Sequence, residues 1–426
     1  MEPSSDAIVQ YESNVRSYVR SFPVTFSRAE GSLLWDESGQ QYIDFFAGAG
    51  ALNYGHNEPG MSKALVDYLQ EKGVVHGLDI ATTAKVRFIE GFESIILRPR
   101  GLDYKLQFTG PTGTNAVEAA LKVARLVTKR RNVIAFSHAF HGVSLGSLAT
   151  TANAWFRDAS GTPLDGVTFL PFDGYIDGLD SIAYLEKVLD DAGSGVDAPA
   201  AVITEIVQGE GGVNTASVEW VKRLREVTAK RDILLIVDDV QAGCGRTGDF
   251  FSFEFADIQP DIVVLSKSIS GFGLPMSLVL LKPEFDIWKP GQHNGTFRGN
   301  NLAFVTSLKA LEMFWSSYDL SEEVKRKETI VRERLEQIKQ SHPDSFIAVR
   351  GRGLLYGLEC RDGKTAKLVT RRCFENGLAI ETAGVNDEVV KLMPALTIDD
   401  EMLDKGLGIL EQVAESLDAH ELTKEE

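Results

Sequence analysis

Cysteine is scarce in this chain of 426 residues. The three cysteines, Cys244, Cys360 and Cys373, form no CxxC pair and make an odd number. This pattern fits neither a disulfide framework nor a zinc site. We therefore expect the protein to work in a reducing compartment.

Basic residues and long apolar runs are also few. The 44 Lys and Arg residues face 61 Asp and Glu residues, which leaves a net charge of −17 and disfavours binding to nucleic-acid phosphates. No run approaches the ~18 apolar residues that span a bilayer. The first residues, MEPSSDAIVQYE, also lack the basic and apolar regions of a signal peptide. We expect a cytoplasmic protein with no nucleic-acid or membrane partner.

The middle of the chain repeats one pattern, in which a short apolar run ends in small or polar residues and leads into a stretch with helical periodicity. Such alternation predicts an α/β fold with a largely parallel sheet, and near-continuous apolarity predicts burial of both sheet faces. The seven runs are residues 105–109, 132–136, 166–170, 200–206, 233–237, 261–265 and 277–281.

The flanking regions follow other patterns. Residues 31–46 predict a hairpin with a turn at 36–39. Residues 320–340 predict a long helix, and short strands are expected at 346–349 and 354–358. A further helix and an acidic, frayed tail are expected at the C-terminus.

A possible anion site follows the first apolar run, in TGPTGTNAVEAALKVARLV (109–127). Apolar spacing predicts a helix here, and Asn115 with Glu118 has the form of a capping box. Free N–H groups and the helix dipole favour a phosphate at such a helix start. The alternative is a helix that is merely well capped.

Two adjacent carboxylates, Asp238 and Asp239, directly follow the buried run ILLIV. Buried carboxylates are costly unless a cation meets them. The candidates are Mg²⁺, an arginine such as Arg246, or the protonated ring nitrogen of a cofactor. A paired structural carboxylate is the alternative.

Lys267 lies two residues beyond another buried run, in DIVVLSKSISGFGLP (261–275). A lysine in desolvating surroundings has a depressed pKa and can form a Schiff base. An anchor for phosphate, a carboxylate for a pyridinium nitrogen and an imine-forming amine together are what pyridoxal phosphate requires.

Other motifs support competing functions less well. Residues 142–146 spell GxSxG, the nucleophile motif of serine hydrolases, but Ser144 lies about seven residues beyond the preceding run rather than on its turn. His138 and His141 lack further metal ligands nearby. Residues 351–353 lack the dinucleotide-binding spacing, and a non-catalytic interaction protein would not explain Lys267.

At this point the chain resembles the class III (ω) aminotransferases, which are pyridoxal phosphate enzymes of fold type I. The resemblance runs from SFPVTFSRAEGSLLWDESGQQYIDFFAGAGALNYGH (21–56) to KLMPALTIDDEML (391–403). It implies an N-terminal segment of a small α+β domain (1–55), a large cofactor domain with a seven-stranded sheet (56–301) and a C-terminal small domain (302–426).

The resemblance also assigns roles around the cofactor. Lys267 would form the Schiff base and move the proton, Asp238 would face the ring nitrogen, and Gln241 would lie near the ring hydroxyl. Backbone N–H groups of Gly113 and Thr114 would hold the phosphate.

Further roles come from the same resemblance. In the FHG stretch, Phe140 would stack on the ring with His141 beside it, and Thr296 would reach the phosphate of a neighbouring subunit. Glu205 matches the glutamate that relatives use as a substrate switch.

Lys391 stands where many relatives place a carboxylate-binding arginine, so we expect it to receive the α-carboxylate of glutamate and to pair with Glu205 when the other substrate is bound. The alternative is that Lys391 is solvated and another residue, such as Arg352, holds the carboxylate.

Three stretches, DDVQAGCGRTG, LSKSISGFGLP and WKPGQHNGTFRGNN, most resemble members that transfer the amino group of L-glutamate to L-aspartate 4-semialdehyde. The products would be L-2,4-diaminobutyrate and 2-oxoglutarate, the first step of ectoine biosynthesis. Val143 replaces the arginine that follows FHG in relatives acting on γ-aminobutyrate; a γ-aminobutyrate or ornithine enzyme is the alternative. The resemblance further implies a homodimer or higher oligomer with shared sites, and allows a potassium ion.

Overall fold

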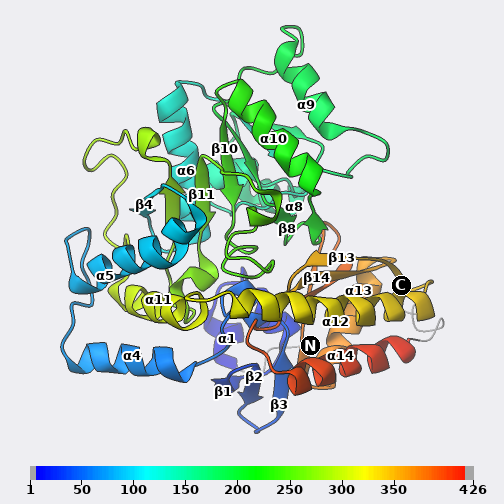
Figure 1. The fold of residues 1–426 in the computed structure, drawn as a ribbon. Coiled ribbons are helices and arrows are strands. Elements are labelled where there is room, and N and C mark those ends of the chain that lie inside the picture. Colours follow the sequence, from blue (N-terminus) through cyan, green and yellow to red (C-terminus); the bar gives the residue numbers. More distant parts are fainter. Residues whose placement is uncertain (1–5, 418–426) are drawn as a thin grey trace.

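The central feature of the computed structural model, which describes residues 6–417, is a sheet of seven strands (Figure 1). The strands are β4 (Lys105–Phe108), β5 (Val133–Phe136), β6 (Val167–Leu170), β7 (Ala201–Thr204), β10 (Leu234–Asp238), β11 (Ile262–Leu265) and β12 (Leu278–Leu281). Their order is β4-β12-β11-β10-β7-β5-β6, and only β12 runs antiparallel to its neighbours. All seven predicted strands and the largely parallel sheet are confirmed.

Both faces of this sheet are buried, as the unbroken apolar runs predict. In β11, Val263 and Leu265 belong to one core, whereas Ile262 and Val264 belong to the other. Successive side chains of a strand point to opposite faces, so an unbroken apolar run supplies two cores. Helix α6 (Gly113–Thr128) covers one face with its alanine- and valine-rich side.

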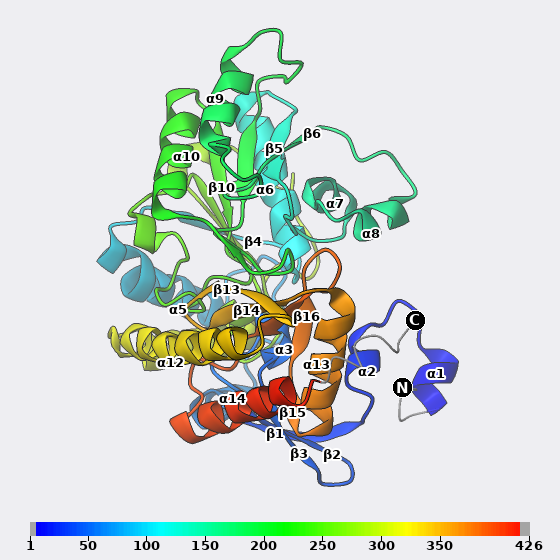
Figure 2. The same cartoon turned by 90° about the vertical axis from the view of Figure 1, so that its right-hand side faces the viewer.

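The remaining helices of the middle region surround the sheet. Helices α9 and α10 pack on the face opposite α6, while α4, α5 and α11 lie beside one edge, and α7 and α8 lie beyond the other (Figures 1 and 2). Their bounds are α4 (Pro59–Gln70), α5 (Thr83–Phe92), α7 (Leu145–Thr150), α8 (Ala154–Arg157), α9 (Ser181–Asp190), α10 (Val218–Lys230) and α11 (Asn301–Phe314).

The two ends of the chain build two smaller sheets. The expected hairpin is present as β2 and β3, but the sequence reading missed β1, which extends it, and β15 from the C-terminal region, which pairs in parallel with β3. The first sheet comprises β1 (Phe26–Glu30), β2 (Leu33–Asp36), β3 (Gln41–Asp44) and β15 (Leu378–Ala379). The second comprises β13 (Phe346–Arg352), β14 (Leu355–Cys360), β17 (Val389–Leu392) and β16 (Glu381–Ala383).

Helices cover these sheets and begin the described chain (Figure 2). The predicted long helix is α12, and the predicted C-terminal helix is α14. The bounds are α1 (Asp6–Tyr11), α2 (Tyr18–Ser21), α3 (Ala47–Gly50), α12 (Asp319–Ser341), α13 (Gly363–Glu375) and α14 (Asp400–Glu415). The acidic tail lies outside the described residues, and the domain boundaries at 55 and 301 remain predictions. No helix within residues 6–417 is both long and apolar enough to cross a membrane.

One buried cation ties the middle of the chain to both ends. Arg246 has no exposed surface, and its guanidinium donates to the carbonyls of Leu354 (2.9 Å) and Pro394 (2.5 Å) and to Asn53 Oδ1 (2.6 Å). Burial lowers the pKa of Arg246 to about 9. Because these partners are mostly neutral carbonyls, Arg246 holds three segments together rather than neutralising an acidic site.

We expect Arg246→Met to destabilise the protein by about 3 kcal/mol or more, because three buried acceptors lose their donor. Urea unfolding at equilibrium would measure the change. The control is Arg223→Met, since Arg223 pairs with Asp180 at the surface and surface pairs contribute little. Equal effects of the two substitutions would contradict this role for Arg246.

Candidate functional site

The candidate site lies at the carboxyl edge of the large sheet. Asp238 ends β10, Lys267 follows β11 by two residues, and α6 begins at Gly113 after β4. Strands β10 and β11 pair in parallel, with Asp238 opposite Val264. The parallel strands therefore bring the three sequence motifs to one edge, where open α/β sheets bind ligands.

The helix start expected to hold phosphate is present, but its cap is not the predicted one. Thr112 is the residue before α6, and Asn115 lies inside the helix, where its side chain accepts from Thr112 Oγ1 (3.0 Å). Glu118 does not close a capping box. The first N–H groups of α6, including those of Gly113 and Thr114, therefore stay available for an anion.

Glu118 supports a second helix start next to this one. Its Oε1 accepts from the N–H groups of Gly146 (2.7 Å) and Ser147 (3.1 Å), and from Ser144 Oγ (3.0 Å). Ser144 also lies 2.6 Å from Thr114 Oγ1. Ser144 is thus part of a hydroxyl cluster before α7, and the described contacts give it no histidine that could activate it as a hydrolase nucleophile.

Asp238 is held by histidine. Its Oδ2 lies 2.7 Å from His141 Nδ1, and its Oδ1 accepts from the N–H of Val240 (3.1 Å). The predicted alternative of an Asp238–Arg246 pair is wrong, because Arg246 binds the carbonyls described above. Among residues 6–417, no group of three or more His, Cys, Asp or Glu side chains forms a metal site, and His138 instead contacts Asn214 and the Tyr175 ring.

Asp239 faces different surroundings. Its Oδ2 accepts from the N–H of Ser252 (2.9 Å), and burial raises the pKa of Asp239 to about 7. Asp238 ends β10 next to β11, the strand that leads into Lys267, and its negative charge opposes the lowering of the Lys267 pKa. Asp239 is engaged with Ser252 and Asp238 with His141, and Asp238 stays our candidate to face a ring nitrogen.

Lys267 adopts a left-handed backbone conformation (φ 51°) at the start of a short 3₁₀ helix, η5 (Lys267–Ser270). Such a conformation costs free energy for a residue with a side chain. Desolvation lowers the pKa of the Lys267 amine, while Glu210 acts in the opposite direction. A lowered pKa increases the fraction of neutral amine, which is the nucleophilic form.

Gln241 has an unsatisfied amide oxygen inside the site. Its Nε2 donates to the Ala49 carbonyl (3.1 Å) and to Glu210 Oε1 (3.1 Å), whereas its Oε1 is buried without a partner. His141 Nε2 is likewise buried and unpartnered. Orphaned polar atoms beside a free helix N-terminus fit a ligand that carries polar groups and a phosphate, as pyridoxal phosphate does.

Glu205 holds a loop together. Its two oxygens accept from the N–H groups of Phe140 (3.0 Å) and Gly209 (3.3 Å), and burial raises the pKa of Glu205 to about 7. Phe140, the predicted stacking residue, packs edge-on against Phe156 at 5.2 Å. Glu205 therefore fixes the segment that carries Phe140.

Lys391 is fully buried between two carboxylates that the sequence reading missed. Its Nζ lies 2.8 Å from Glu210 Oε1 and 3.0 Å from Glu381 Oε1. The expected pairing with Glu205 is not the one the structure forms. Glu210 lies between glycines in QGEGG, five residues after Glu205, and these glycines were the sequence feature that could have marked it as a site residue. No sequence feature marks Glu381, because its contact with Lys391 depends on strand pairing.

Three other residues remain, of which Thr296 and Val143 lie at the surface and Arg352 lies elsewhere. Thr296 is exposed, and its loop reaches the segment before α5 through Phe297, whose ring meets His76 at 5.3 Å. Val143 is 57% exposed. The Arg352 guanidinium lies over the ring of Phe255. The carboxylates that act on it, Glu328 and Asp249, differ from those that act on Lys267.

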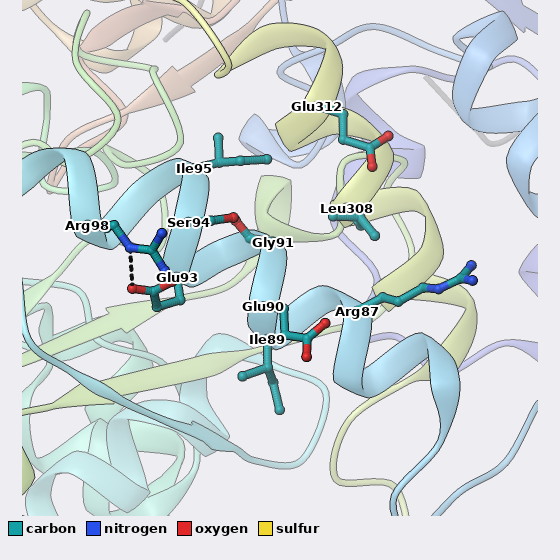
Figure 3. A pocket seen from close by; sticks show the side chains of 10 residues that line it. All are labelled: Arg87, Ile89, Glu90, Gly91, Glu93, Ser94, Ile95, Arg98, Leu308 and Glu312. Atoms are coloured by element: carbon teal, nitrogen blue, oxygen red, sulfur yellow. Dashed lines mark hydrogen bonds and ion pairs between the residues drawn. The ribbon is translucent and has the colours of Figure 1, made fainter.

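A groove of about 730 Å³ between α5 and α11 is separate from this edge (Figure 3). Its charged rim includes the ion pair of Arg98 with Glu93. The groove contains none of the predicted site residues.

Comparison with known proteins defines the class. Residues 15–414 match the model of the family "Aminotransferase class-III". The ornithine aminotransferase of Toxoplasma gondii, crystallised with partial occupancy of PLP at its active site, superposes with a TM-score of 0.83 at 26% identity, over 96% of this chain and 93% of that one. The fold is thus fold type I of the PLP-dependent transferases.

The chain belongs to the class III aminotransferases and is a transaminase, as the resemblance predicts. A diaminobutyrate–2-oxoglutarate transaminase of Bordetella parapertussis is 61% identical over 95% of this chain and 94% of its own length. A protein of the same name from Vibrio parahaemolyticus is 52% identical over 97% and 98% of the two chains.

A side chain at Gly209 would force Gln241 to move, because an added Cβ would lie 1.6 Å from Gln241 Oε1. We expect Gly209→Ala to displace Gln241 and lower transaminase activity about a hundredfold, with circular dichroism showing a retained fold. Gly408→Ala is the control, since a Cβ at Gly408 on α14 meets no atom within 4 Å. Wild-type activity in Gly209→Ala would refute this constraint.

Proposed function

We propose that the protein transfers the amino group of L-glutamate to L-aspartate 4-semialdehyde, giving L-2,4-diaminobutyrate and 2-oxoglutarate. The observation that carries the proposal is the 52–61% identity to diaminobutyrate–2-oxoglutarate transaminases over nearly the whole of both chains. The product would feed ectoine biosynthesis in the cytoplasm. A γ-aminobutyrate or ornithine specificity is the alternative.

The chain's own residues support pyridoxal phosphate as the cofactor. When bound, it supplies a reactive carbonyl and an electron sink for amino-group transfer. The N–H groups of Gly113 and Thr114 would bind its phosphate, and Gln241 would meet its ring hydroxyl. Phe140 would cover its ring, with His141 behind.

Asp238 and Lys267 would control the protonation of the cofactor ring and the proton transfer from the substrate. Asp238, oriented by His141 at 2.7 Å, would keep the ring nitrogen protonated. Lys267 would hold the cofactor and, when substrate displaces it, take the proton from the substrate α-carbon. Its lowered pKa favours the neutral amine, which is the form that can act as a general base.

Lys391 is the proposed receiver of the glutamate α-carboxylate. It now binds Glu210, and we infer that the substrate carboxylate replaces Glu210 on the ammonium. Glu205 takes no part in this exchange and keeps its bonds to Phe140 and Gly209. Lysine provides a single point charge here, in contrast to the bidentate fork of arginine.

A homodimer or higher oligomer with shared sites is part of the proposal. Exposed apolar side chains gather before and at the start of α5 and on the Thr296 loop; they are Val74, Val75, Leu78, Ile80, Val86 and Phe297. Such side chains suit an interface, across which Thr296 would reach a neighbour's phosphate. The potassium ion that the resemblance allows has no cluster of acidic ligands among residues 6–417, and the proposal does not depend on it.

Acceptor specificity tests the function. With glutamate as donor, we expect kcat/KM for L-aspartate 4-semialdehyde to exceed that for succinic semialdehyde about tenfold to a hundredfold, because Val143 leaves an ω-carboxylate unpaired. Chromatographic detection of L-2,4-diaminobutyrate gives the measurement. Val143→Arg should improve the use of succinic semialdehyde, and a wild-type preference for succinic or glutamate semialdehyde would favour the alternatives.

Asp238 and Asp239 provide a matched pair. Asp238→Asn should retain cofactor, seen by its visible absorbance, but lose kcat about a hundredfold or more, because a neutral amide does not keep the ring nitrogen protonated. Asp239→Asn should keep most activity, since its oxygen can still accept from Ser252. The opposite ranking of the two variants would place the cofactor against Asp239.

A further inference from the structure

Glu381 is the second carboxylate on a single buried ammonium. Lys391 has no exposed surface, and the Glu381 side chain is 6% exposed. A buried ammonium needs one compensating charge, and Glu210 already supplies it at 2.8 Å. The second carboxylate therefore requires a separate explanation.

The backbone holds Glu381 and Lys391 rigidly against each other. They are cross-strand partners in the antiparallel pair β16–β17. Only Ile380 separates β16 from β15, which belongs to the other small sheet. The backbone of Phe45 hydrogen-bonds to residues next to both strands. Its N–H donates to the carbonyl of Ala379, just before β16, and its carbonyl accepts from the N–H of Met393, just after β17 (2.8 Å each).

Glu210 is attached differently. It lies in the glycine-flanked turn between β8 (Val207–Gln208) and β9 (Asn214–Thr215), and its side chain is 28% exposed. One of its oxygens, Oε1, accepts from both Lys391 and Gln241. Of the two carboxylates, Glu210 is the one that can leave toward solvent, because neither a strand pair nor full burial holds it.

We propose that Glu381 is a positioning residue that keeps the Lys391 ammonium at the carboxylate-binding point while a substrate carboxylate replaces Glu210. This inference rests on the proposed function, in which glutamate and the semialdehyde present different groups near the ring. The lysine side chain is flexible. If the Lys391 ammonium exchanges Glu210 for a substrate carboxylate, it therefore needs a second partner, Glu381, that stays in place.

Protonation follows from the same geometry. The groups that face Glu381 are Lys391 from β17, Glu210 from the turn after β8, Lys267 from η5 and Tyr18 from α2. Burial raises the pKa of Glu381 to about 7, and Lys391 opposes this shift. The arriving carboxylate takes the place of Glu210 on the ammonium, while Glu210 stays on its turn and keeps its charge nearby. The negative charge around Glu381 therefore increases, which raises that pKa further. Binding therefore takes up a proton, and affinity falls as pH rises through about 7.

Two variants of Glu381 test this role in the holoenzyme. Glu381→Ala should raise the glutamate KM about tenfold or more, with a smaller effect on the half-reaction with L-2,4-diaminobutyrate, whose carboxylate lies farther from the reacting amine. Glu381→Gln, which keeps an acceptor, should restore most glutamate binding at pH 6. Glu359→Gln is the control, because Glu359 is a partly buried strand carboxylate that pairs with Arg350 outside the site.

Calorimetry gives a readout besides activity. Glutarate, which lacks an amino group, is titrated near pH 7 in buffers of different ionisation enthalpy. Wild type and Glu359→Gln should take up more protons on binding than Glu381→Gln does. Equal proton uptake in all three, or equal loss of both half-reactions in Glu381→Ala, would overturn the proposal. If wild type makes no L-2,4-diaminobutyrate but the proton difference persists, the proposed function fails and the role of Glu381 stands.

Discussion

Buried cations set the constraint on which the rest of this structure depends. Arg246 and Lys391 have no exposed surface, and a buried charge is tolerated only where several segments supply partners together. Arg246 donates hydrogen bonds to backbone carbonyls of the C-terminal region and to the Asn53 side chain of the N-terminal region. Lys391 pairs with Glu210 of the middle region and with Glu381 of β16. The site therefore exists only when both ends of the chain have folded against the large sheet.

The same constraint separates supporting residues from exchangeable ones. Asp238 and Glu381 lie on strands, and His141 is buried against Asp238, so that each makes a short contact to a neighbour that is itself buried. Glu210 lies on a turn and is partly exposed. A transaminase that accepts two substrates with differently placed charges needs both kinds of residue, because a wholly rigid site would fit only one of them.

Sequence reasoning was strongest where the signal is local. The seven apolar runs became the seven strands, because burial on both faces requires unbroken apolarity. It was weaker at β1 and β15, where short strands carry little pattern of their own. It also misplaced the cap of α6: Asn115 and Glu118 have the right spacing for a capping box, but Glu118 instead accepts from the start of α7, a partner far along the chain.

By itself, the sequence determined the α/β class, the strands, and the motifs that carry Lys267, Asp238 and the phosphate-ready helix start. Each of these follows from apolar periodicity or from a residue type placed directly after a buried run. Only the tertiary structure decided that Glu210 and Glu381, not Glu205, share Lys391. Glu205 and Glu210 lie five residues apart in the sequence, but Glu205 directly follows β7 whereas Glu210 lies in the turn between β8 and β9. Glu381 reaches Lys391 through antiparallel pairing, and strand register is a property of the folded sheet rather than of either strand alone.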